Sequence, residues 1–451
     1  MKVDVEQASR VELLDLIKQL LAGVQLLEVR VHELEAENEH LRAGGTKEPP
    51  SWVKASRSTS GEKKERQKRA RGSGRHRHAP TTVMQHAVAQ CPQCDLLLGG
   101  GREVSRRQVI DVPRVPVEVT DHVVVERLCP HCRTAWKPAV DLREAVVGGQ
   151  RIGIHLQTEV AVLRERWRLP FRSIQDYRLM RCGLDVRVGE LVSLVHGVAA
   201  RGRSVYASLG AQINASAVVY GDDTGWREDG QNGYLWSFST PSVRYYLFRR
   251  TRAGSVVADV IGEEFEGVLV SDFYAGYNID EGRHQRCWVH LLRDLHELTQ
   301  PHAENAAVVG WAAAVRAVYD KAKAYAGPSR RVTEVEEHAA RRAQQHAFER
   351  ELMDVCAPSV KTKQPMSVLC QRVEKYLPEM FMFVADPRVA SDNNAAERSL
   401  RGPVVSRKIS GGTRSAKGSE TKSVVASLCG TWLQQGVNVY EACRQMLAAP
   451  T

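Results

Sequence analysis

The chain has 451 residues, which at about 150 residues per domain predicts roughly three structural units. Hydrophobic residues make up 43% and charged residues 26%, as in ordinary globular proteins, which excludes a wholly disordered chain. The formal net charge of +10 favours a polyanionic partner, and nucleic acid fits it better than an anionic membrane. The sequence has neither a run of about 18 apolar residues nor a signal-peptide core, so we expect a cytosolic protein without a membrane partner.

Residues 1–43 carry leucine at every seventh position, which is the pattern of a leucine-zipper coiled coil. These d positions are Leu13, Leu20, Leu27, Leu34 and Leu41. The a positions hold Ile17, Val24, Val31 and Asn38, and β-branched residues at a with leucine at d favour a parallel two-stranded coil. We therefore predict a homodimer or higher oligomer. An amphipathic helix packed on its own domain is the alternative.

Residues 44–83 read as a basic disordered linker. Between Ser51 and Pro80 there are ten Lys or Arg and two Glu, with almost no large apolar side chains. A solvated charge run and non-specific contact with phosphates are equally compatible with this composition.

Two CxxC pairs lie in residues 84–142. They are Cys91 with Cys94 and Cys129 with Cys132. In a reducing compartment such pairs favour a metal over disulfides, and four thiolates complete the tetrahedral shell of one structural Zn²⁺. We predict a zinc-ribbon-like domain in which the alternating segment 109–127 forms β-strands that bring the two knuckles together.

Residues 143–215 read as helices with a turn at Cys182 and Gly183, because apolar residues recur at helical spacing on both sides. A helix-turn-helix that binds DNA fits this pattern. A plain helical pair that packs on the next domain fits it equally well.

Residues 216–300 switch to an extended pattern and form the first part of a predicted catalytic core. The runs AVVYGD, GYLWSFS and VRYYLF predict three strands, SVVADVIGEEF a helix, and GVLVSD a fourth strand. The first strand is expected to end at Asp222-Asp223 and the fourth at Asp272. Neighbouring strands would bring Asp222 and Asp272 within a few ångströms, a costly contact unless a cation such as Mg²⁺ lies between them.

A third carboxylate follows a predicted helical insertion over residues 301–370. In the second part of the core, residues 371–451, Asp392 or Asn393 is expected to cap a helix that holds Glu397 about one turn inside. The nearby cations offer a phosphate-binding, DNA-binding surface. They are Arg398, Arg401, Arg407 and Lys408.

The chain resembles the IS66 family of bacterial insertion-sequence transposases over nearly its whole length. The resemblance rests on the N-terminal leucine coil, the four-cysteine segment and the motifs GDDTGW, SDFYAGYN, CWVHLLRDL and DNNAAERSLR. It implies an RNase H-like DDE domain with the triad Asp222, Asp272 and Glu397, and it matches Cys287 and His290 to an accessory CxxH signature. Where the family commonly has Asp-Glu-Thr, this chain has Asp222-Asp223-Thr224. Either aspartate could be the first ligand, and we choose Asp222.

The sequence thus predicts a multidomain α/β protein with a parallel coiled coil, a zinc-ribbon-like segment, a helical DNA-binding region and an RNase H-like catalytic domain with a helical insertion. As a transposase it would hold two Mg²⁺ about 4 Å apart, cut transposon ends with water and join the 3′-hydroxyl to target DNA. Its partners would be double-stranded terminal-repeat and target DNA and small accessory proteins of the element, in the cytoplasm at the nucleoid. The alternatives are a non-catalytic dimeric zinc-containing DNA-binding regulator and a Mg²⁺-dependent nuclease without strand transfer.

Overall fold

The computed structural model describes scattered positions between Lys18 and His32, and residues 78–112, 116–262, 264–278, 283–327 and 335–450. The chain divides into two compact units, Met1–Ile110 and Asp111–Thr451. Most of the basic linker and all the d-position leucines except Leu27 lie outside the described residues.

In the first unit, the described positions between Lys18 and His32 are helical. Three of them belong to the predicted zipper seam, and each exposes about half of its surface or more: Val24 (50%), Leu27 (66%) and Val31 (52%). The helix agrees with the predicted periodicity, while the predicted pairing with a second chain stays a prediction.

The β-strands predicted for segment 109–127 are wrong for every described residue but the last. The described residues of 109–126 form no strand, and the only ladder nearby joins β1 (Arg127–Leu128) to β2 (Ala135–Trp136). Every described valine of this segment is exposed, and Val119 is 86% exposed. Pro113 and Pro116 remove two ladder donors, so the alternating pattern has neither a partner strand nor an apolar layer to cover it.

Four helices precede the sheet, as the helical pattern of residues 143–215 predicts. They are α2 (Ile154–Glu165), α3 (Phe171–Cys182), α4 (Val188–Arg201) and α5 (Arg203–Asn214). Gly183 ends α3 with a left-handed φ of 69°, a conformation that glycine adopts without steric cost. The predicted glycine turn is therefore present between α3 and α4.

A five-stranded mixed sheet forms the centre of the second unit, in the order β5-β4-β3-β6-β7. The strands are β3 (Val218–Glu228), β4 (Gln231–Ser239), β5 (Arg244–Arg249), β6 (Val268–Ser271) and β7 (Arg283–Arg286). The pairs β5–β4 and β4–β3 are antiparallel, whereas the pairs β3–β6 and β6–β7 are parallel. Four strands were expected from the sequence, and β7 was not.

The expectation that the first strand ends at Asp222-Asp223 is wrong. The strand β3 continues to Glu228 because β4 pairs with it along its whole second half, from Tyr220 to Glu228. Only the parallel pairing with β6 stops early, at Tyr220. The two aspartates therefore lie inside a strand, at the point where one of its two neighbours ends.

Helices cover both faces of the sheet and form two large hydrophobic cores with it, beside a smaller cluster around Trp226, Leu235 and Tyr246. Val219 and Leu269 belong to the first core, with α2, α4, α5, α6 (Ser255–Ile261), α13 (Ala416–Gln434) and α14 (Val439–Ala448). Tyr220 and Val270 belong to the second core, which is built with the later helices. These are α7 (Trp288–Thr299), α8 (Ala306–Ala326), α9 (Val335–Val360), α10 (Ser367–Tyr376), α11 (Met382–Ala385) and the start of α12 (Asn394–Ser410).

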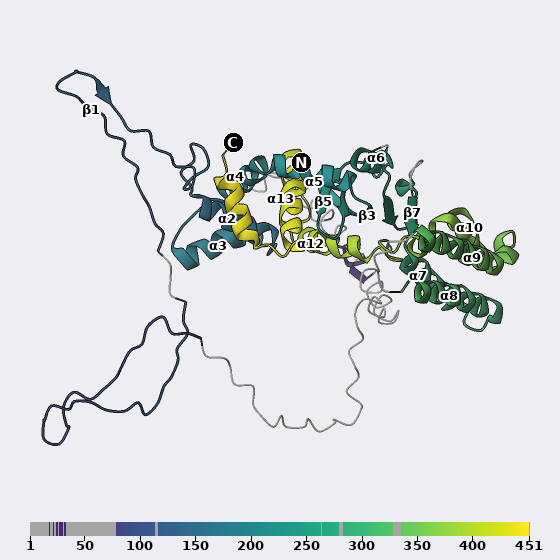
Figure 1. Cartoon of the computed structure of the whole chain (residues 1–451), viewed down its shortest axis with the longest axis horizontal. Coiled ribbons are helices and arrows are strands. Elements are labelled where there is room, and N and C mark those ends of the chain that lie inside the picture. The colour runs from purple at the N-terminus through teal and green to yellow at the C-terminus, as the bar shows by residue number, and fades with distance from the viewer. Residues whose placement is uncertain are drawn as a thin grey trace. The chain divides into compact units, whose positions relative to one another are not determined.

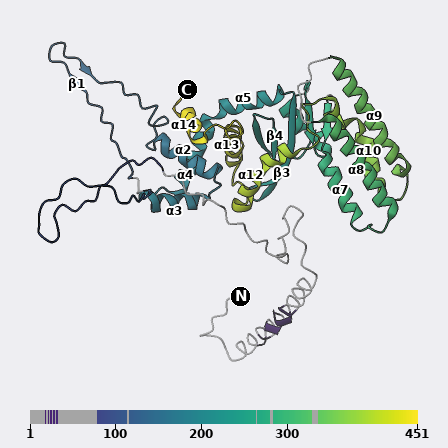
Figure 2. The same cartoon turned by 60° about the horizontal axis from the view of Figure 1, so that its bottom comes forward.

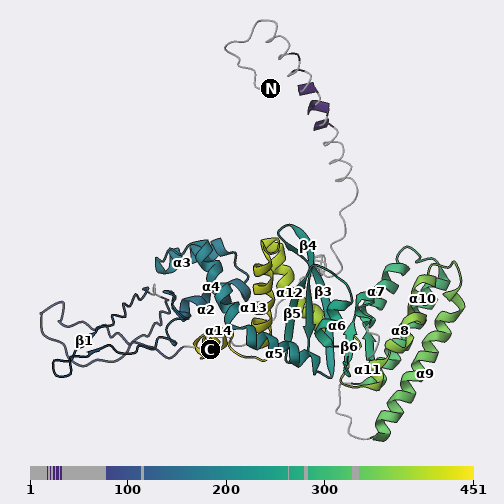
Figure 3. The same ribbon diagram turned by 90° about the horizontal axis from the view of Figure 1, so that it is seen from above.

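Figures 1, 2 and 3 show α8, α9 and α10 beyond the β7 edge of the sheet, and α2, α3 and α4 beyond its β5 edge. The helix α12 contacts β3 and β4, and α13 contacts β5. Among the described helices, none combines the length and apolar character that crossing a bilayer requires.

Candidate active site

Asp222 and Asp223 are neighbours on β3, and their side chains face opposite sides of the sheet. Successive residues of a strand alternate between its faces. Asp223 shares the face of Val219 and the first core, and Asp222 shares the face of Tyr220 and the second core. The sheet therefore places the two adjacent acids in different surroundings.

Asp272 lies beside Asp222, as the sequence predicts. In the parallel pairing Val218 faces Val268 and Tyr220 faces Val270, so both aspartates lie two residues beyond the last pair. The backbone N–H of Tyr274 donates a hydrogen bond of 2.9 Å to Asp272 Oδ1. This contact fixes the orientation of the Asp272 carboxylate directly after the strand ends.

The surroundings of Asp222 disfavour its charged form. Burial is the largest cause of its raised pKa, which reaches about 7, and the charges of Asp272, Asp223 and Glu397 act in the same direction. The backbone N–H of Asp223, 2.8 Å from Asp222 Oδ1, opposes the shift. A buried carboxylate among other acids suits a divalent cation, which would neutralise them together.

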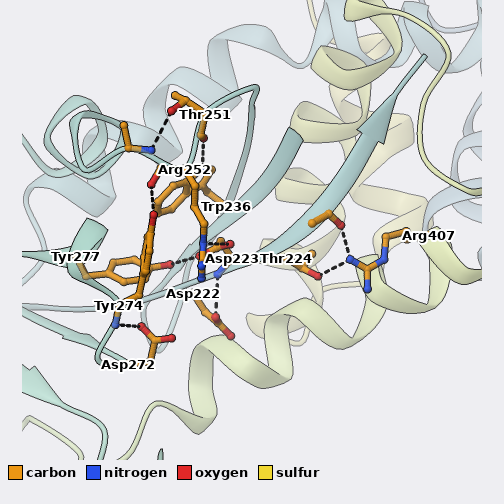
Figure 4. A network of polar contacts seen from close by, with 12 residues as sticks. Asp222, Asp223, Thr224, Trp236, Thr251, Arg252, Asp272, Tyr274, Tyr277 and Arg407 are labelled. Carbon is orange, nitrogen blue, oxygen red and sulfur yellow. Dashed lines mark hydrogen bonds and ion pairs between the residues drawn. The ribbon is translucent and has the colours of Figure 1, made fainter. Parts of the chain in front are cut away.

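Asp223 forms an ion pair with Arg252 within the chain. Its side chain is 3% exposed, and both carboxylate oxygens accept from Arg252 Nε, at 3.1 and 3.0 Å. Tyr277 donates its hydroxyl to Asp223 Oδ1 at 3.2 Å. Figure 4 shows Arg252 and Tyr277 reaching Asp223, while Asp222 points away from them. Asp223 is thus engaged within the protein, whereas Asp222 faces other acids.

Glu397 lies in the first turn of α12, as predicted, on the helix that packs against β3. The side-chain amide of Asn393 donates a hydrogen bond of 2.7 Å to the carbonyl of Gly221, the residue before Asp222. Asn393 therefore does not cap α12 with its side chain. Asp392 instead accepts from the N–H of Asn394 at 3.1 Å.

Cys287 and His290 contact the start of α12. The buried Cys287 Sγ accepts a hydrogen bond of 3.2 Å from the N–H of Asn393, and burial raises the pKa of this thiol to about 11. His290 Nε2 lies 3.8 Å from Glu397 Oε1. Both residues of the CxxH signature thus adjoin the segment that carries Glu397.

The four cations expected to bind DNA divide into two groups. Arg398, Arg401 and Lys408 are exposed, and their spacing of three and seven residues places them along one side of α12. Arg407 instead donates to Thr224 Oγ1 at 2.9 Å and to the carbonyl of Gly225. Arg407 therefore ties α12 to β3 through contacts within the chain.

The carboxylates do not form a closed set of metal ligands. Within the described part of the chain, no group of three or more His, Cys, Asp or Glu side chains is arranged to hold a metal ion. The charges of Asp272 and Glu397 both act on Asp222, and the three acids come from β3, from the residue after β6 and from α12.

Each CxxC pair forms the same type of turn. The backbone N–H of the first cysteine donates to the carbonyl five residues later, Cys91 to Leu96 and Cys129 to Thr134. The carbonyl of the first cysteine accepts from the N–H of the residue after the second cysteine, Asp95 or Arg133. All four distances are 2.9 Å. That following residue is left-handed in both turns, with φ of 56° at Asp95 and 52° at Arg133. One turn lies in each of the two units.

Local hydrogen bonds favour the thiolate in both turns. Those from Gln93 and the second cysteine lower the pKa of Cys91, and those from Thr134 lower the pKa of Cys132 to about 7. A thiolate is the form that binds metal.

Sequence reasoning missed Asn393, Arg252, Tyr274 and Tyr277 as residues around the carboxylates. Tyr274 and Tyr277 lie two and five residues after Asp272, and a motif read only for its acid does not reveal them. The position of Asn393 before a helix predicts only a capping role. Arg252 lies in the irregular segment between β5 and α6, and the sequence there carries no signal that it reaches Asp223.

The comparisons agree with the motifs and this geometry. A search of curated proteins finds no match. The profile of the family described as "Transposase IS66 family" matches residues 149–421, which is more than half of the chain and includes Asp222, Asp272 and Glu397. The chain therefore belongs to the IS66 family of transposases.

Proposed function

We propose that this protein is a DDE transposase that cleaves transposon ends and joins them to target DNA, with Asp222, Asp272 and Glu397 as its catalytic carboxylates. The observation that carries the proposal is the pairing of β3 with β6, which sets Asp222 beside Asp272. The first turn of α12 brings Glu397 to β3. A mixed sheet with one acid on β3 and another directly after the adjacent parallel strand β6 supports an RNase H-like catalytic domain.

Two Mg²⁺ are the cofactors we propose for this site. The donor set fits, because Mg²⁺ prefers carboxylate oxygens, and burial together with the charges of the surrounding acids raises the pKa of Asp222. When bound, the ions would activate the attacking and leaving oxygens of a phosphodiester. The chain would hold them with the three carboxylates, while the Tyr274 N–H orients Asp272 and Asn393 fixes the start of α12.

The exposed side of α12 is the proposed contact for DNA phosphates. Arg398 and Arg401 lie within the first two turns of this helix, next to Glu397, and Lys408 lies further along it. Cations there would position a phosphate backbone beside the carboxylates. We assign Arg407 to holding α12 on β3, since its Nη1 donates to Thr224 Oγ1 and to the carbonyl of Gly225 on that strand. The helices α3 and α4 are a second proposed DNA contact.

The remaining assignments rest on the sequence and on local geometry. We propose one structural Zn²⁺ on Cys91, Cys94, Cys129 and Cys132, supported by two turns with identical hydrogen bonds. We propose dimerisation through residues 1–43, small accessory proteins as further partners, and a place at the bacterial nucleoid.

The decisive experiment combines purified full-length protein, Mg²⁺ and labelled terminal-repeat DNA. Joined products are expected for the wild type. The substitutions Asp222→Asn, Asp272→Asn and Glu397→Gln should each reduce cleavage and joining by several orders of magnitude while leaving end binding intact. Asp259→Asn is the matched control, because Asp259 is an exposed acid on α6.

The two alternatives give different products. Cleavage without joining would indicate a Mg²⁺-dependent nuclease. Binding of ends without any cleavage would indicate a non-catalytic regulator. If the control variant lost activity as the triad variants do, the loss would not report on metal ligands.

A further inference from the structure

The segment after Asp272 is held by side chains from the opposite face of the sheet. Here the chain turns through η1 (Ala275–Tyr277), and Tyr277 is fully buried. Its hydroxyl donates to Asp223 Oδ1 at 3.2 Å. Tyr274, whose N–H binds Asp272, donates its hydroxyl to the carbonyl of Arg252 at 2.8 Å.

Arg252 connects these two tyrosines. Its guanidinium lies 3.7 Å from the ring centre of Tyr274 and forms the ion pair with Asp223. The indole N–H of Trp236, on β4, donates to the carbonyl of Thr251 at 3.4 Å and so fixes the backbone beside Arg252. Figure 4 shows this closed set of contacts between β3, the segment after β5 and the segment after β6.

Two glycines allow the segments on either side of the ion pair to touch. A Cβ added to Gly276 would lie 3.1 Å from the Arg252 carbonyl and 2.4 Å from the Tyr274 ring. A Cβ added to Gly254 would lie 3.1 Å from the Gly276 carbonyl. The backbone after Asp272 therefore packs directly on the backbone that carries Arg252.

We propose that Asp223, Arg252, Tyr274 and Tyr277 form a brace that sets the position of Asp272 relative to Asp222. The brace begins at the residue next to Asp222 and ends at the N–H that binds Asp272. It rests on the proposed function, because the two acids are the proposed Mg²⁺ ligands. Its members are positioning residues, since their contacts are with each other and with the ligand-bearing backbone.

An ion pair that only adds stability would look different. Stability alone would not require contacts with both tyrosines of the segment that follows Asp272, or with the residue adjacent to Asp222. Removing a group that orients a metal ligand typically lowers the metal affinity by about 10- to 100-fold. The proposal therefore predicts a change in metal affinity beyond the change in stability.

The test measures binding of Mn²⁺ to the full-length protein without DNA, by electron paramagnetic resonance, and the Mg²⁺ concentration that half-saturates end cleavage. The brace variants are Tyr277→Phe, Arg252→Met and Arg252→Lys. The matched controls are Tyr325→Phe, an exposed tyrosine on α8, and Arg249→Met, an exposed arginine at the end of β5.

We expect Tyr277→Phe and Arg252→Met to weaken Mn²⁺ binding by about tenfold or more and to raise the half-saturating Mg²⁺ concentration in parallel. Arg252→Lys keeps the charge and should lose less affinity than Arg252→Met. Both controls should bind Mn²⁺ as the wild type does. If Arg252→Met does not fold, Tyr277→Phe and Arg252→Lys decide the question.

Wild-type Mn²⁺ affinity in folded Tyr277→Phe and Arg252 variants would overturn the brace. A loss of affinity that only follows a loss of thermal stability would overturn it too. Asp222→Asn separates the two levels of the argument: if it binds Mn²⁺ and cleaves ends like the wild type, the proposed function itself fails. If Asp222→Asn is inactive while the brace variants bind metal normally, only the brace fails.

Discussion

The side-chain amide of Asn393 donates a 2.7 Å hydrogen bond to the carbonyl of Gly221. This bond joins α12, the helix that carries Glu397, to β3, the strand that carries Asp222. Asn393 is 1% exposed, and its own N–H donates to Cys287 Sγ. One residue thus connects β3, the start of α7 and the start of α12. The relative position of Asp222 and Glu397 depends on this contact.

We predict that Asn393→Ala lowers the free energy of unfolding by about 1–3 kcal/mol, because a buried hydrogen bond is lost. End cleavage should fall further than stability explains, since the start of α12, which carries Glu397, is no longer tied to the strand that carries Asp222. Asn394→Ala is the matched control, because the variant keeps the backbone N–H that donates a hydrogen bond to Asp392 Oδ1. Denaturant unfolding and cleavage rates, measured on the same preparations, test this. Equal cleavage in the Asn393 and Asn394 variants would contradict it.

The raised pKa of Asp222 makes the metal-free protein sensitive to pH. The pKa rises from 3.8 to about 7 on folding, so the folded protein keeps this proton at pH values where the unfolded chain has released it. The free energy of unfolding should therefore fall as pH increases from about 4 to about 7, and change no further above that. Asp222→Asn should remove this part of the pH dependence.

Thermal unfolding midpoints in a chelator, measured from pH 5 to 8, test the difference between wild type and Asp222→Asn. Mg²⁺ competes with the proton, so the apparent Mg²⁺ affinity should increase with pH up to about 7 and then level off. Asp259→Asn should follow the wild type. Identical pH profiles for wild type and Asp222→Asn would show that Asp222 is ionised throughout this range.

Much of the sheet could be predicted because its strands have local signatures. The apolar run before Asp272 correctly predicted β6, and with it the closeness of Asp222 and Asp272. The strand β7 could not be found in this way, since its sequence is Arg-His-Gln-Arg. Its buried Gln285 and Arg286 are satisfied by the carbonyl of Met380 and by Glu379, residues from a distant part of the chain.

The closeness of Asp222 and Asp272 could be predicted from the sequence, and the residues around them could not. An apolar run directly before each acid is a local signal that the sequence itself carries. The hydrogen bond of Asn393 to Gly221 joins residues 172 positions apart, and Arg252 reaches Asp223 across 29 positions. Contacts of this kind follow from the tertiary fold and leave no periodic pattern.

The cysteine turns lead to a prediction about metal content. We expect one Zn²⁺ per chain in the purified protein, held by the four thiolates with no ligand position open for water. Replacing Cys91 and Cys129 with serine together should abolish stoichiometric zinc. Replacing the buried Cys443 with serine is the control, because it belongs to neither turn. Elemental analysis measures the zinc content of each protein. Zinc retained in the double variant would contradict the assignment of Zn²⁺ to the four cysteines.

The zipper prediction concerns Leu20 and Leu27, which occupy successive d positions. Replacing both with glutamate places charges in the predicted seam and should convert the full-length protein from dimer to monomer. Val29 is the matched control, because it is helical, 61% exposed and at an f position outside the seam. Val29→Glu should leave the dimer intact. Sedimentation equilibrium of the three proteins measures this directly, and a double variant that dimerises as tightly as the wild type would assign dimerisation to another part of the chain.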